Sequence, residues 1–80
     1  PDNFMAHNEL GVITWKNGNL ATAQKHFEDA IAADPSFVLA QRNLGQLFSS
    51  QGKVDDAVRQ YREAGEWGDG PSWLAAAQLL

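Results

Sequence analysis

The sequence lacks cysteine, has few basic residues and contains no long apolar run, and each absence narrows the functions open to it. Without cysteine there is no disulfide framework, no thiolate nucleophile and no cysteine ligand for a metal ion. The net charge of -4, from six basic and ten acidic residues, repels a phosphate backbone and argues against a nucleic-acid partner. No apolar run approaches membrane-spanning length, and no signal peptide opens the sequence. We therefore expect a soluble chain without membrane insertion, in a compartment that the sequence leaves unknown.

What the sequence does contain is an internal repeat. The pair Leu10-Gly11 recurs 34 residues later as Leu44-Gly45. The same step aligns further identical residues, namely Pro1 with Pro35, Ala6 with Ala40, Gly18 with Gly52, Ala23 with Ala57 and Ala30 with Ala64. A step of 36 residues then places Pro35-Ser36-Phe37 on Pro71-Ser72-Trp73, which marks the start of a third unit. Periods of this length predict stacked supersecondary units within the 80-residue domain, divided here as 1–34, 35–70 and 71–80.

The repeated residues resemble the tetratricopeptide repeat (TPR), whose pattern W-x2-L-G-x2-Y, A-x3-F and P also spans about 34 residues. Matches in the first unit are Leu10-Gly11, Ala23-x3-Phe27, Ala30 and Pro35, and in the second Leu44-Gly45, Phe48, Ala57-x3-Tyr61 and Ala64. Departures are His7 and Gln41 in place of Trp, and Thr14 in place of an aromatic residue. The resemblance implies an all-α fold, a right-handed solenoid of antiparallel helix pairs with two repeats and a truncated third or capping helix.

Hydrophobic spacing and turn residues predict five helices. The first helix of each pair, here called the A helix, is expected over 4–15 and 38–50, and its partner, the B helix, over 20–33 and 54–66, with a further A helix over 72–80. Asp2 or Asn3 is expected to cap the first helix and Asn19 the second. The A and B helices are expected to cross closely at Gly11, Gly45, Ala23 and Ala57. Gly11→Leu would then cost about 1–3 kcal/mol by overpacking.

In repeats of this family the A helices line a concave groove that takes an extended or helical peptide, so the resemblance implies a protein or peptide partner of unknown identity. The residues predicted to bind it are Asn8, Val12, Trp15, Arg42, Asn43, Gln46 and Ser49. Some family members grip a carboxylate pair at chaperone tails, but only Asn43 has a counterpart of that clamp here. Arg42 beside Asn43 is still able to hold a single carboxylate through a bidentate hydrogen bond.

No catalytic, cofactor-binding or metal-binding constellation is predicted, and the chain is not expected to be an enzyme. His7 is expected to be a packed or half-buried structural residue, and His26 lies beside Phe27 without a second ligand at metal-site spacing. Asp55 and Asp56 are expected to favour the start of a helix through its dipole.

Two alternatives to peptide binding remain open. The segment after residue 72 is apolar nearly all round, so the chain is also interpreted as a structural or self-assembly segment of a longer repeat array, with no peptide ligand of its own. Its assembly surface would comprise Trp67, Trp73 and Leu74. Alternatively, Trp67 and Trp73 fold against each other as a structural plug between the second and third units. The other alternative is a non-catalytic appendage of an enzyme in the same polypeptide.

Overall fold

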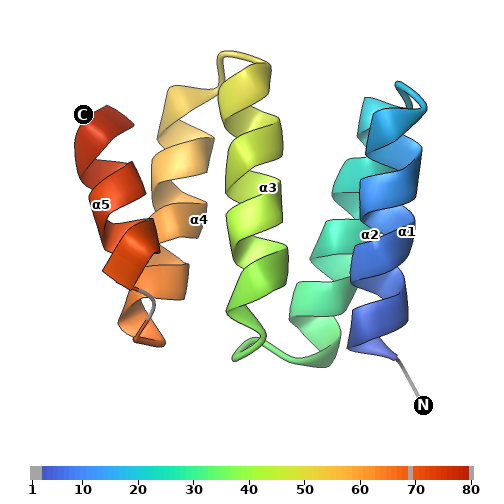
Figure 1. The fold of residues 1–80 in the computed structure, drawn as a ribbon, viewed down its shortest axis with the longest axis horizontal. Helices are drawn as coiled ribbons and strands as arrows, with labels where there is room; N and C mark the ends of the chain where they lie inside the picture. Colours follow the sequence, from blue (N-terminus) through green and yellow to red (C-terminus); the bar gives the residue numbers. More distant parts are fainter. Residues whose placement is uncertain (1–2, 69, 80) are drawn as a thin grey trace.

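The computed structural model describes residues 3–68 and 70–79, except for the side chain of Trp73, and its regular elements are all helices (Figure 1). The helices are α1 (Phe4–Lys16), α2 (Leu20–Ala33), α3 (Val38–Ser50), α4 (Val54–Glu66) and α5 (Gly70–Leu79). In this described part of the chain there is no strand, which confirms the predicted all-α class. None of these helices is both long and apolar enough to cross a membrane.

Glycine makes the turn within each helix pair. Gly18, between α1 and α2, has φ +84°, and Gly52, between α3 and α4, has φ +76°. This left-handed conformation is easy for glycine and costly for other residues, so the chain reverses after only three non-helical positions. The Asn-Gly-Asn and Gln-Gly-Lys segments therefore encode antiparallel pairs, as the sequence predicted.

The predicted helix caps are correct at one asparagine and wrong at another. The Oδ1 of Asn3 accepts a hydrogen bond of 3.1 Å from the backbone N–H of Ala6, which satisfies one free amide of the first turn of α1. Asn19 precedes α2, but its side chain makes no capping hydrogen bond. Its own backbone N–H instead donates to the carbonyl of Thr14 at 2.9 Å, so its position is set by the end of α1. The other proposed cap, Asp2, lies outside the described residues.

The helices of each pair touch where a glycine meets an aromatic ring. An added Cβ on Gly11 would lie 2.5 Å from Cε1 of Phe27, and one on Gly45 would lie 2.9 Å from Cε1 of Tyr61. Both distances are below van der Waals contact, so only glycine fits without movement of the ring. Phe27 is fully buried and Tyr61 is 8% exposed. The predicted close crossing at the Leu-Gly positions is therefore present in both pairs.

The pairs pack side by side in a row (Figure 1). Contacts between α2 and α3 and between α1 and α3 join the pairs, and α5 packs against α4. The core that runs through them contains Ala23, Phe27, Leu44, Leu47, Phe48, Ala57, Val58, Tyr61 and Ala76. One side of α5 closes this core through Ala76, which is 3% exposed, whereas Leu74 is 61% exposed. The helix begins at Gly70, two residues before the expected start.

Candidate functional site

A hydrogen bond between two asparagines joins the first helices of the two pairs. The Nδ2 of Asn43 on α3 donates to the Oδ1 of Asn8 on α1 at 2.9 Å. Asn8 is only 5% exposed and Asn43 is half-buried. Both were predicted to contact a partner, but Asn8 has little surface for that and its carbonyl oxygen is used within the fold. This bond sets the relative position of α1 and α3, which carry the candidate binding face.

The apolar members of the predicted face are partly absorbed into the core. Val12 and Trp15 on α1 are half-buried and pack against the core cluster. The Trp15 ring meets the Phe27 ring nearly edge-on, with centroids 6.2 Å apart and an interplanar angle of 81°. Edge-to-face geometry is favourable for aromatic rings and holds the indole in place. The accessible remainder of Trp15 is therefore a fixed apolar surface.

The polar members of the face lie on α3 and are more accessible. Gln46 is exposed, while Arg42 and Ser49 are half-buried. Arg42 lies close enough to Tyr61 to influence its hydroxyl. Burial raises the pKa of Tyr61 above its usual range, and the positive charge of Arg42 opposes that rise. The structure thus brings a guanidinium, an amide and a hydroxyl together on one helix, beside the asparagine bridge.

The predicted assembly residues lie at the other end of the row. Trp67 is 57% exposed and Leu74 is 61% exposed. Trp67 follows α4 as its C-cap, and Leu74 lies on α5. The side chain of the third member, Trp73, lies outside the described part of the structure. The predicted contact between Trp73 and Trp67 therefore lies outside it as well.

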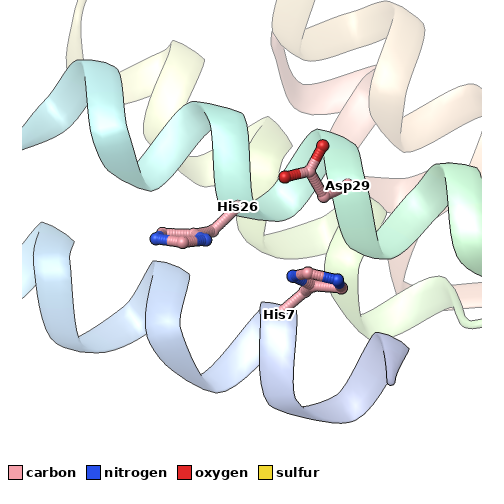
Figure 2. A group of neighbouring side chains, drawn as sticks. All are labelled: His7, His26 and Asp29. Atoms are coloured by element: carbon pink, nitrogen blue, oxygen red, sulfur yellow. The ribbon is translucent and has the colours of Figure 1, made fainter. Parts of the chain in front are cut away.

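Sequence reasoning missed a cluster of three potential metal ligands in the first helix pair. His7 on α1 and His26 and Asp29 on α2 each offer a ligand atom, and these atoms all lie within 4.8 Å of one another (Figure 2). The imidazole rings stack with centroids 6.5 Å apart and an interplanar angle of 25°. The sequence alone carried no direct signal for this cluster, because residues on two different helices become neighbours only when the packing of α1 against α2 is known.

A shallow pocket of about 500 Å³ lies away from these residues, along α4. Its lining is mostly charged and consists of Asp55, Val58, Arg59, Arg62, Glu63 and Glu66. Asp56, in the first turn of the same helix, pairs with Arg59 at 3.5 Å. Acidic side chains in the first turn interact favourably with the helix dipole. This agrees with the structural role expected for Asp55 and Asp56. The lining residues all belong to one helix face, and charges of both signs on such a face are typical of a solvent-exposed helix.

Comparison with known proteins identifies the family. The chain is 32% identical over 62 residues to a protein O-mannosyl-transferase of Caenorhabditis elegans. That match covers 78% of this chain but only 9% of the relative. A family model described as tetratricopeptide repeat matches residues 8–71, which is most of the chain. The chain therefore belongs to the tetratricopeptide repeat family, whose members generally serve as non-catalytic scaffolds for protein–protein interaction.

Proposed function

We propose that this chain binds an extended peptide segment or a partner helix on the face formed by α1 and α3. The observation that carries the proposal is the accessible polar row of Arg42, Gln46 and Ser49 on α3, together with the fixed, partly accessible indole of Trp15 on α1. Family membership supports a protein partner in general, and this row supplies the chemistry by which a peptide would be recognised.

The chemistry of this face suits a polypeptide ligand. The amide of Gln46 offers both a donor and an acceptor, which is the complement of a peptide bond. Arg42 suits a carboxylate, because its guanidinium forms two parallel hydrogen bonds to one. Trp15 adds an aromatic surface of the kind that contributes strongly to interfaces. Together these groups favour a ligand with an acidic or terminal carboxylate next to an apolar side chain.

The asparagine bridge gives this face a fixed shape before binding. Since Asn8 and Asn43 tie α1 to α3, the flanking side chains need less ordering when a ligand arrives. We therefore assign Asn8 and Asn43 to positioning the face, and Arg42, Gln46 and Ser49 to contact with the ligand, with Val12 and Trp15 as its apolar floor.

Partner capture from a native extract tests the proposal when each variant has a matched control. Arg42→Glu/Gln46→Ala alters the α3 face without breaking the asparagine bridge, and Arg62→Glu/Gln51→Ala makes the same chemical changes at exposed positions outside α1 and α3. We expect the first variant to lose its partner by at least about tenfold and the control to retain it. Circular dichroism checks that both remain folded. Equal capture by the two variants would contradict the proposal.

The exposed Trp67 and Leu74 favour the self-assembly alternative, and a second experiment separates it from peptide binding. In that case Trp73→Ser/Leu74→Ser would abolish association between copies, measured by sedimentation velocity, whereas Arg42→Glu/Gln46→Ala would not. Association lost only at the α3 face would count against an assembly role.

The O-mannosyl-transferase relative favours a third function, in which the repeats are a non-catalytic part of a larger transferase. The repeats would then hold a protein partner near a catalytic domain elsewhere in that polypeptide. The transcript that encodes this chain provides the test. A transcript with a transferase domain would support this function, and one without it would exclude it.

A further inference from the structure

We infer that His7, His26 and Asp29 form a binding site for a divalent first-row transition-metal ion, with Zn²⁺ as the working probe. The site lies within the first helix pair and its three side chains come from both helices (Figure 2). It would join α1 to α2 independently of any peptide on α3.

The backbone brings the three ligands together. His26 and Asp29 are three residues apart on α2, so they share one face of that helix. His7 approaches them from α1, which packs against α2. The resulting separation between ligand atoms is no more than 4.8 Å. It does not depend on a mobile loop.

The donor set fits a transition metal better than a hard cation. Two imidazole nitrogens and one carboxylate oxygen are ligands used for Zn²⁺, Cu²⁺ and Ni²⁺, whereas Ca²⁺ and Mg²⁺ prefer oxygen alone. Zinc–nitrogen bonds of about 2.0–2.1 Å place tetrahedral ligands about 3.3 Å apart. The present ligand atoms lie within 4.8 Å of one another, so small rotations of the side chains would bring them to that distance. All three side chains are half-buried and keep some contact with solvent.

An unsatisfied ring nitrogen supports this assignment. The Nδ1 of His26 is buried and has no hydrogen-bond partner within the described residues. A buried polar atom without a partner is costly to the fold, and a coordinated metal ion would satisfy it.

Lys25 is the cation that would compete for Asp29. Its Nζ lies 3.8 Å from Oδ1 of Asp29, four residues further along α2. The Lys25 side chain is 77% exposed, so this pair is solvated and contributes little. A divalent ion held by two further ligands would displace it.

The second helix pair supplies an internal comparison. The 34-residue step places Gln41, Gln60 and Glu63 at the positions of His7, His26 and Asp29. The Oε1 atoms of Gln41 and Gln60 are also buried without a hydrogen-bond partner in the part of the chain that is described. The fold thus accepts a neutral polar side chain at both histidine positions, and only the first pair has imidazole ligands there. Glutamine is consequently a conservative replacement for each histidine.

Calorimetric titration of the untagged 80-residue chain with Zn²⁺ tests the site. We expect one equivalent to bind, and His7→Gln/His26→Gln to weaken it by at least about 100-fold, since even outer-shell partners of a metal are worth 10–100-fold. Asp29→Asn should also weaken binding, whereas Glu63→Gln, its counterpart in the second pair, should not. Zinc should raise the Tm of the wild type but not that of the double variant.

Imidazole NMR resonances show whether both histidines act together. The chain has two histidines, and we expect both to shift in proportion up to one equivalent of Zn²⁺. Absence of binding by the wild type, equal affinity in His7→Gln/His26→Gln, or a shift of one histidine alone would each overturn the proposal.

Discussion

Single residues decide how closely the helices of each pair approach. Gly11 and Gly45 occupy equivalent positions 34 residues apart, and each faces an aromatic ring on the partner helix. The sequence predicted a close crossing at both glycines from their repeated positions, but it did not identify the Phe27 and Tyr61 rings as the groups they face. The ring differs between the units, and so does the space left beside it.

Adding one methyl group at these glycines should destabilise the two pairs to different extents. A Cβ on Gly11 would lie 2.5 Å from the Phe27 ring, against 2.9 Å for Gly45 and the Tyr61 ring. Alanine gains about 1 kcal/mol of helix propensity, but overpacking costs about 1–3 kcal/mol. We expect Gly11→Ala to lower the free energy of unfolding by up to about 2 kcal/mol and Gly45→Ala by less.

Urea unfolding measures both variants, with Gly70→Ala as the control. A Cβ at Gly70 would meet no atom within 4 Å, so this substitution should not destabilise the chain. If Gly11→Ala were as stable as Gly70→Ala, the close contact with Phe27 would be refuted.

Tyr61 should make the fold sensitive to alkaline pH. Burial raises the folded-state pKa of Tyr61 above the unfolded value of about 10, despite the opposing charge of Arg42. The folded chain therefore retains the phenolic proton more tightly than the unfolded chain does. The stability due to this difference is fully present below about pH 10 and is lost as the pH rises through the folded-state pKa.

Tyr61→Phe, the residue found at the equivalent position in the first unit, removes this titration. We expect the loss of stability above about pH 10 to be smaller in the variant. Because the chain has one tyrosine, tyrosinate absorbance follows this group alone in the wild type. A tyrosine that ionises at its ordinary pKa in the folded chain would contradict the prediction.

At the scale of whole helices, the sequence predicted the elements well and their junctions less well. Turn glycines and the Asp34-Pro35 pair mark helix ends through local backbone geometry, which requires no tertiary information. The role of Asn19 depended instead on a contact beyond its neighbouring residues. The Asn19 backbone bonds to the end of α1, and a sequence pattern for capping does not contain that contact.

The contact between α1 and α3 should depend on the asparagine bridge. Asn43→Ala would leave the buried Oδ1 of Asn8 without its donor, at a cost of about 1–3 kcal/mol in stability. Asn8→Ala/Asn43→Ala should cost less than the sum of the two single substitutions, because the second change removes the orphaned group. Urea unfolding of the wild type, the two single variants and the double variant measures this coupling. If the losses in free energy of unfolding were strictly additive, Asn8 and Asn43 would not be coupled by the hydrogen bond.

At the scale of the whole molecule, the period and matched positions were sufficient to predict the family and the row of helix pairs. The candidate face was predicted only as a list of outward residues. Its division into positioning and contacting groups depends on a hydrogen bond between residues 35 apart in sequence, which no periodic pattern encodes. The histidine cluster was missed for a similar reason, since its members become neighbours only once the depth of the Gly11 crossing is known.

Peptide binding on the face formed by α1 and α3 is best tested by NMR mapping. A peptide selected from a library by binding to the wild-type chain would be titrated into isotopically labelled protein. We predict the largest changes at the side chains of Gln46 and Arg42 and at the indole of Trp15. Changes confined to α4 and α5, with the resonances of α1 and α3 unmoved, would refute peptide binding on the face formed by α1 and α3.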